Sequence, residues 1–153
     1  MRGITLEQMQ GFAGEIAQSV SSAPKERGSA FVIFLRGELG AGKTTFMQAL
    51  ARELGVEHSI HSPTFSLMKI YPIDFHGFQR LIHIDAYRLN GAEDFCTLAP
   101  DTFLHDPTAI VCIEWPGQVG DALPKPDIDI LFTHPKEDGG QMREVLLSVG
   151  VNK

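Results

Sequence analysis

Residues 37–44 read Gly-Glu-Leu-Gly-Ala-Gly-Lys-Thr and match the pattern G-x-x-x-x-G-K-[ST]. Because glycine has no Cβ, the backbone of such a loop can adopt positive φ angles and turn its N–H groups toward an anion. A helix that begins near Lys43 would add the positive end of its dipole. The Lys43 ammonium would then reach the β and γ phosphates of a nucleotide, and the Thr44 hydroxyl would ligate Mg²⁺. The segment therefore predicts the phosphate-binding loop of a nucleoside triphosphatase.

Two carboxylates follow apolar segments further along the chain. Asp85 comes directly after Leu-Ile-His-Ile, and Glu114 comes directly after Ile-Val-Cys-Ile. An acid just beyond a buried strand is the usual form of the second magnesium-site element in such ATPases. One acid can hold the metal, directly or through water, while the other orients or deprotonates the attacking water. The residues alone do not assign the two roles, and a capping or salt-bridging role is the alternative for each acid.

A histidine accompanies the first of these acids. His83 lies two residues before Asp85 and on the same face of the expected strand. It is either a hydrogen-bond partner that orients Asp85 or an ordinary strand histidine.

Helices and strands alternate among the elements that must position these residues. Apolar spacing predicts an amphipathic helix at 5–20, which a capping box of Thr5 and Gln8 begins, and a second helix at 43–54, which Gly55 ends. A third helix is predicted at 92–104, weakened by Pro100. Strands are predicted at 30–36, 61–71, 80–87, 109–114, 128–133 and 144–149, with a loop at 72–79 and a turn at 135–140.

This order of elements predicts an α/β fold. We expect a single P-loop NTPase-like domain over residues 1–153, with a central, mostly parallel sheet flanked by helices. Segments 61–71 and 80–87 are expected to form an antiparallel hairpin. Ligands bind beyond the carboxyl ends of the strands in such sheets, which is where Asp85 and Glu114 would lie.

Charge and composition restrict the possible partners. The formal net charge is -6 and the basic residues form no run, which argues against tight autonomous nucleic-acid binding. The longest apolar stretch, 30–35, is far shorter than the ~20 residues of a membrane span, and the N-terminal residues lack a signal-peptide apolar region. We therefore expect a soluble, cytoplasmic protein without membrane contact. The spacing of the cysteines and histidines predicts neither a disulfide nor a transition-metal site.

Four blocks of sequence, in a fixed order, resemble a known family. They are residues 37–45 (Gly-Glu-Leu-Gly-Ala-Gly-Lys-Thr-Thr), 62–67 (Ser-Pro-Thr-Phe-Ser-Leu), 83–89 (His-Ile-Asp-Ala-Tyr-Arg-Leu) and 113–116 (Ile-Glu-Trp-Pro). The blocks are similar to those of the bacterial TsaE (YjeE) ATPases, which are needed for the threonylcarbamoyladenosine (t6A) modification of tRNA. The likeness spans roughly residues 5–150.

The resemblance implies ATP as the nucleotide and Mg²⁺ as the cofactor. It implies a catalytic acid at Asp85, a magnesium-side carboxylate at Glu114, and a switch-like segment that contains Thr64. It places Thr45 near the α phosphate. The implied nucleotide-binding residues are Glu38, Leu39, Gly40, Ala41, Gly42, Lys43, Thr44 and Thr45.

The resemblance also implies protein partners of the TsaD and TsaB type. ATP hydrolysis would reset their modification cycle, and tRNA would be reached only indirectly through them. Because no arginine finger is assigned, we predict slow hydrolysis by the isolated chain and faster hydrolysis with the partners.

Two other functions fit the phosphate-binding loop. A small-molecule kinase of the P-loop class would need an arginine-rich lid, and no segment of the chain has that composition. A nucleotide-gated, non-catalytic binding subunit would use ATP occupancy alone to control docking. A GTPase is disfavoured, since no Asn-Lys-x-Asp sequence occurs.

Overall fold

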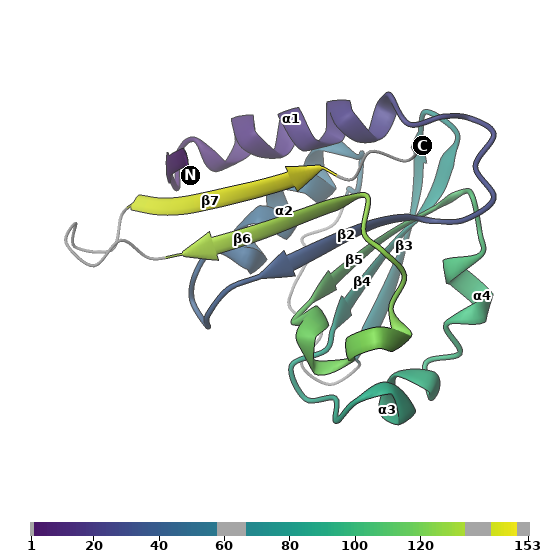
Figure 1. Ribbon diagram of the computed structural model, residues 1–153. Coiled ribbons are helices and arrows are strands. Elements are labelled where there is room, and N and C mark those ends of the chain that lie inside the picture. The colour runs from purple at the N-terminus through teal and green to yellow at the C-terminus, as the bar shows by residue number, and fades with distance from the viewer. Residues whose placement is uncertain (1, 58–66, 134–141, 150–153) are drawn as a thin grey trace.

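A computed structural model describes residues 2–57, 67–133 and 142–149, which form a seven-stranded sheet with helices on both faces (Figure 1). The strands are β1 (Arg2–Thr5), β2 (Phe31–Arg36), β3 (Met68–Phe75), β4 (Phe78–Asp85), β5 (Ala109–Glu114), β6 (Ile128–Thr133) and β7 (Met142–Val149). The helices are α1 (Met9–Ser21), α2 (Lys43–Glu53), α3 (Ala92–Cys96) and α4 (Asp101–Leu104), with short 3-10 turns η1 (Pro116–Gln118) and η2 (Gly120–Ala122).

The sheet is mixed, with parallel strands at its centre. The strand order is β1-β7-β6-β2-β5-β4-β3. Strands β6, β2, β5 and β4 run parallel, whereas β1, β7 and β3 pair antiparallel with their neighbours. The predicted α/β class and the hairpin of β3 and β4 are therefore confirmed, and parallel pairing is limited to the four central strands.

The central strands are buried on both faces. Ile33 and Leu35 of β2 pack in the core beneath α1 and α2, and Val32 and Phe34 pack in the core that also holds residues of α3 and α4. In Figure 1, α2 lies behind the sheet. Burial on both faces explains why residues 31–35 and 109–113 are continuous apolar runs without alternation.

The predicted end of α2 is confirmed, whereas α1 begins later than predicted, at Met9 with Gln8 as its N-cap. The Gln8 N–H donates to Thr5 Oγ1 at 3.2 Å and the Thr5 N–H donates to Gln8 Oε1 at 3.0 Å, so the reciprocal bonds of the predicted capping box form in the turn that precedes the helix. After α2, Gly55 has φ 88°, and the N–H of Val56 donates to the Ala51 carbonyl at 2.9 Å. This is the hydrogen bond of a Schellman helix end.

Aromatic contacts fix α2 against its surroundings. The ring of Phe46 on α2 lies 5.5 Å from that of Phe12 on α1 and 5.5 Å from that of Phe132 on β6, measured between centroids. All three side chains are almost fully buried. The first residue of α2, Lys43, is therefore held by a helix that packs on both α1 and the sheet.

Two predicted elements were wrong in part, and one strand was missed. Residues 2–5 form a strand that was not predicted, and β3 continues through Pro72 to Phe75, where a loop was expected. An edge strand tolerates proline because its outward N–H has no partner to lose. The predicted helix 92–104 is divided into α3 and α4, because Ala99 adopts φ 53° directly before Pro100. Predicted segments at 61–66 and 135–140 lie outside the described residues.

None of the helices in the described ranges combines the length and the apolar character that a membrane span requires.

Candidate functional site

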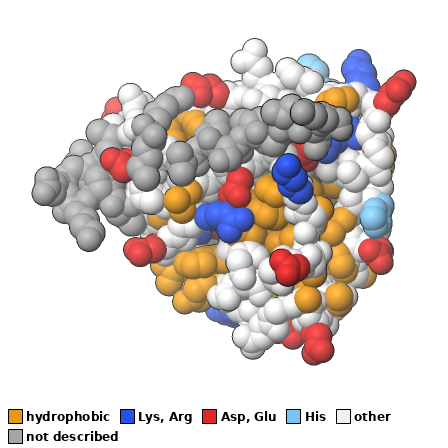
Figure 2. Space-filling view, viewed as in Figure 1, with side chains coloured by type: hydrophobic (Ala, Val, Ile, Leu, Met, Phe, Trp, Pro, Cys, Tyr) orange, Lys and Arg blue, Asp and Glu red, His pale blue; other side chains and the backbone are white. Residues whose placement is uncertain are grey.

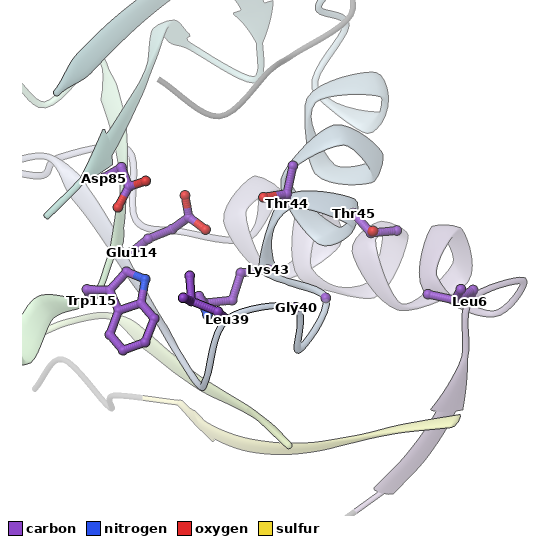
Figure 3. A pocket seen from close by; sticks show the side chains of 10 residues that line it. Leu6, Leu39, Gly40, Lys43, Thr44, Thr45, Asp85, Glu114 and Trp115 are labelled. Atoms are coloured by element: carbon purple, nitrogen blue, oxygen red, sulfur yellow. The ribbon is translucent and has the colours of Figure 1, made fainter. Parts of the chain in front are cut away.

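A cavity of about 230 Å³ lies between the glycine-rich loop after β2 and the carboxyl ends of β4 and β5 (Figure 3). We call it the cup. It is lined by Leu6, Leu39, Gly40, Gly42, Lys43, Thr44, Thr45, Asp85, Glu114 and Trp115. The cup is thus at the end of the parallel strands where ligands bind in open α/β sheets.

Glycines with positive φ shape the loop. Gly40 has φ 76° and Gly42 has φ 109°. Gly42 is the N-cap of α2, and its carbonyl accepts a hydrogen bond of 2.9 Å from the Phe46 N–H. The N–H groups of the first helical turn lack partners within the helix, so the helix presents donors and its positive dipole end to the cup.

Lys43 is held inside the loop. Its Nζ donates to the carbonyls of Gly37 at 2.6 Å and Glu38 at 2.8 Å, and it lies 4.5 Å from the centroid of the Trp115 ring. The residue is only 5% exposed. Burial lowers the pKa of Lys43 from its ordinary value, while the negative charges of Glu114 and Asp85 act to raise it.

The two acids are brought together by the sheet. Asp85 and Glu114 are register partners at the ends of β4 and β5. Figure 3 shows both carboxylates at one end of the cup, facing the side where Thr44 lies. Asp85 Oδ1 accepts a hydrogen bond of 3.1 Å from the Tyr87 N–H, and Glu114 is 3% exposed.

This donor set fits magnesium. The cup carries two carboxylates, one ammonium and the Thr44 hydroxyl, so its own charge would repel a polyphosphate unless a divalent cation accompanied it. Mg²⁺ prefers oxygen ligands and keeps several waters, and one or two carboxylates suffice to hold it. Thr44, Asp85 and Glu114 are the residues that would hold the ion.

His83 contacts Glu114 rather than Asp85. Its Nε2 lies 2.8 Å from Glu114 Oε2, and both side chains are buried. The hypothesis that His83 orients Asp85 through a hydrogen bond was therefore wrong about the partner. Both acids lie on the same sheet face as His83, and the sequence could not distinguish the acid on the same strand from the acid on the adjacent strand.

Trp115 turns the chain away from the sheet directly after Glu114. Its φ of 60° is unusual for a residue with a side chain. Its ring covers the Lys43 ammonium and lies 4.9 Å from the Tyr87 ring, between centroids. The ring therefore forms one wall of the cup and restricts the position of Lys43.

Most residues expected at the site lie together. Leu39, Gly40, Gly42, Lys43, Thr44, Thr45, Asp85 and Glu114 line the one cup. Glu38 contributes its carbonyl to Lys43, and its side chain is exposed. Ala41 is buried, and its N–H donates to the Glu38 carbonyl at 3.1 Å. Thr64 lies outside the described residues.

Leu6 lines the cup without having been expected there. It is 47% exposed although it is apolar. No feature of the sequence separates it from the other apolar residues around α1, so the sequence carried no signal for it.

Comparison with known proteins gives consistent matches. Residues 5–145 match the family described as "Threonylcarbamoyl adenosine biosynthesis protein TsaE". The tRNA threonylcarbamoyladenosine biosynthesis protein TsaE of Treponema pallidum is 40% identical over 105 residues, which is 69% of this chain and 73% of that protein. The protein of the same name from Bacillus subtilis is 32% identical over 122 residues, which is 80% of this chain and 72% of that protein. The crystal structure of Bacillus subtilis YdiB matches with a TM-score of 0.64 and 27% identity, covering 96% of this chain and 82% of that one.

The sheet and the glycine-rich loop between β2 and α2 define a protein with a P-loop NTPase-like fold. The sequence match covers most of the chain. The chain belongs to the TsaE family, which takes part in the biosynthesis of t6A in tRNA.

Proposed function

We propose that this chain hydrolyses ATP in the presence of Mg²⁺ and thereby resets a TsaD and TsaB type partner complex in the t6A modification of tRNA. The observation that supports this proposal is the geometry of the cup. Lys43 and Thr44 stand on the loop side, and Asp85 and Glu114 stand at the ends of the two adjacent strands. Phosphoryl transfer to water needs groups that position phosphate on one side and water on the other.

The loop side would bind the polyphosphate. Backbone N–H groups of the loop and of the first turn of α2 would donate to phosphate oxygens. Lys43 makes two hydrogen bonds to loop carbonyls, and its ammonium has a third donor. Magnesium, when bound, supplies positive charge to the β and γ oxygens.

The acid side would act on the attacking water. An oxygen of Asp85 or Glu114 accepts a hydrogen bond from the water and aligns it with the γ phosphorus. The new P–O bond forms as the bond between the γ phosphorus and the β–γ bridging oxygen breaks. The water proton passes to the carboxylate, and the products are ADP and inorganic phosphate.

The charges around the cup support the proposed partner dependence. No arginine is among the described residues that line it, so Lys43 is the lining side chain that meets the developing negative charge. Arginines supplied by a partner accelerate several P-loop enzymes strongly. We therefore propose that the chain alone is slow and that the partner complex stimulates it. Contact with tRNA would be made by the partners.

Single-turnover hydrolysis of magnesium ATP tests the proposal, with the chain alone and with the TsaD and TsaB type proteins. We expect slow hydrolysis alone, stimulation by the partners, and loss of hydrolysis when magnesium is chelated. Asp85→Asn should lower the hydrolysis rate by about 10²- to 10⁴-fold, as removal of a general base does, while nucleotide binding survives. The exposed Asp121→Asn is the matched control and should hydrolyse at the wild-type rate.

Measurement of t6A formation over several cycles shows whether the chain must hydrolyse ATP or only bind it. If the Asp85→Asn chain binds ATP, does not hydrolyse it and still supports repeated cycles, the chain acts as a nucleotide-gated binding subunit. Equal hydrolysis rates with and without the partners would contradict the stimulation.

A further inference from the structure

We propose that His83 is a positioning residue for Glu114. It hydrogen-bonds one oxygen of the Glu114 carboxylate, which leaves the other oxygen directed into the cup. The inference rests on the proposed function, since it concerns the same reaction. It assigns a role to a buried, titratable side chain that does not itself line the cup.

His83 lies on the same face of the sheet as the two acids, two register positions further from the cup. His83 is the register partner of Cys112, and Asp85 is the register partner of Glu114, in the parallel pair of β4 and β5. Residues two apart on a strand share a face, so His83 and Glu114 are diagonal neighbours on one face. Cys112 belongs to the core beneath α1 and α2, which identifies that face.

The contact between the two side chains has the geometry of a charge-assisted hydrogen bond. Nε2 and Oε2 are 2.8 Å apart, and the exposed fractions of the side chains are 0% for His83 and 4% for Glu114. A carboxylate only accepts, so the proton must be on Nε2. This contact therefore places a proton on Nε2 of His83.

The other ring nitrogen, Nδ1, makes histidine a less favourable core residue than an apolar side chain at this position. Nδ1 is buried and has no hydrogen-bond partner among the described residues. A buried, unsatisfied polar atom costs free energy, and an apolar side chain of similar size would avoid that cost. Compensation comes from the bond to Glu114, which an apolar side chain could not make.

Without the hydrogen bond from His83, the Glu114 carboxylate would be free to change its orientation. It sits at the end of a flexible side chain, and the backbone leaves the sheet at Trp115 immediately afterwards. The Lys43 ammonium is close enough to interact electrostatically with it. If released by His83, the carboxylate would be drawn toward the ammonium that has to meet the phosphates. A fixed orientation keeps the acid and the ammonium available for their separate roles.

Two substitutions of His83 test this role through kinetics. His83→Leu removes the donor, whereas His83→Gln retains an amide N–H at a similar reach. We expect His83→Leu to lower kcat by about 10- to 100-fold, as loss of a residue that orients a metal ligand does. The Kd of ATP measured by calorimetry without magnesium should change by no more than about twofold, because His83 does not line the cup that would bind the nucleotide. His83→Gln should recover part of kcat.

Cys112→Ala is the matched control because Cys112 is the buried register partner of His83. It should lower the midpoint of thermal unfolding and leave kcat unchanged. If His83 only fills the core, then both His83 variants will likewise lose thermal stability and keep the wild-type kcat, and the proposal is wrong.

Nitrogen NMR of the histidine rings gives a readout that needs neither nucleotide nor activity. The chemical shifts of His83 in the free chain should report the Nε2–H tautomer. Glu114→Gln should move these shifts more than Asp85→Asn does, because it replaces the charged acceptor. An Nδ1–H tautomer, or a larger response to Asp85→Asn, would overturn the proposal even if His83→Leu does not fold.

The two proposals fail in different ways. Absence of hydrolysis by the wild-type chain, with and without partners, removes the proposed function and leaves the NMR result standing. Normal wild-type hydrolysis with an undiminished kcat in both His83 variants removes the role of His83 alone.

Discussion

The Lys43 ammonium contacts both the backbone of the loop and the Trp115 ring. It is bound to the carbonyls of Gly37 and Glu38 and is covered by the Trp115 ring. These contacts connect the Lys43 side chain to the backbone of the loop, so the ammonium and the loop are held together. A group that is already held in place loses less conformational freedom when a ligand binds to it.

Replacement of Lys43 by methionine should therefore weaken nucleotide binding. A hydrogen bond to a charged group contributes about 1.5–3 kcal/mol, so the Kd of magnesium ATP should rise by about 10- to 100-fold. Calorimetric titration measures this change directly. Lys25→Met, at an exposed lysine outside the cup, is the control and should bind as the wild type does. Equal Kd values for the two variants would show that Lys43 does not bind phosphate.

Gly37 is restricted by its neighbour on the sheet. It has φ 135°, and a Cβ at this position would lie 2.3 Å from the Phe132 carbonyl oxygen on β6. Gly37→Ala should therefore displace the loop from β6 and lower the free energy of unfolding by more than about 1 kcal/mol. Gly28→Ala, where a Cβ would contact nothing within 4 Å, is the matched control. Urea unfolding of both variants tests this, and similar stabilities would contradict the expected clash.

At the scale of elements, the end of the sheet opposite the cup is held by a partly buried ionic network. Asp106 accepts hydrogen bonds from the Thr108 N–H at 2.8 Å, the Thr108 hydroxyl at 2.6 Å and Arg80 Nε at 3.0 Å. These bonds connect the start of β5 to β4. Partial burial acts to raise the pKa of Asp106, but the bonds from Thr108 and Arg80 outweigh it and hold the pKa below its ordinary value.

This lowered pKa gives a prediction about acid stability. At neutral pH, Asp106→Asn should lower the free energy of unfolding by about 2 kcal/mol through loss of charge-assisted hydrogen bonds. Because the folded-state pKa lies below the ordinary 3.8, the contribution is fully present above pH 3.8 and is lost as the pH falls through the folded-state pKa.

Urea unfolding of the wild type and of Asp106→Asn at a series of pH values measures this contribution. The difference in free energy of unfolding between the wild type and Asp106→Asn should become smaller as the pH falls. Asp101→Asn, whose side chain is 93% exposed, should differ from the wild type by less than about 0.5 kcal/mol. A difference in free energy of unfolding that stays constant down to pH 2 would contradict the role of the Asp106 charge.

The elements that local patterns determine were predicted well. The long amphipathic α1 and α2, their caps, and the buried β2 and β5 all have signals within a few residues. β1 has only four residues and depends on pairing with the distant β7, so its own sequence carries no comparable pattern. Pro72 suggested a loop because the sequence does not show that β3 lies at the edge of the sheet, where proline is tolerated.

The site was predictable where chemistry depends on a local motif. The loop residues around Lys43 and the acids at the strand ends were named from the sequence, and the sheet register then places Asp85 beside Glu114. The contact of His83 with Glu114 joins two residues that are 31 positions apart in the sequence and lie on different strands. It could be found only from the three-dimensional register.

At the scale of the whole molecule, charge argues against direct binding of RNA. The formal net charge is -6, and on the face shown in Figure 2 acidic and basic side chains are interspersed among apolar ones. Binding of nucleic acid requires neutralisation of several phosphates by clustered basic groups. The family role in tRNA modification is thus compatible with contact through partner proteins.

We predict that the isolated chain binds unmodified tRNA with a Kd weaker than about 10 μM at physiological salt, the range of non-specific contact. Fluorescence anisotropy of labelled tRNA measures this, with the TsaD and TsaB type proteins added in a second titration as the positive control. Tight binding by the chain alone, with a steep dependence on salt, would contradict an indirect role.

The position of β1 also has a consequence for biosynthesis. β7 lies between β1 and β6, and among the strands that the structure describes β1 pairs only with β7. On a translating ribosome, the glycine-rich loop and both acids are synthesised before residues 142–149. Residues 2–5 must therefore wait as an unpaired nascent segment, and the outer edge of the sheet can close only after β7 has left the exit tunnel.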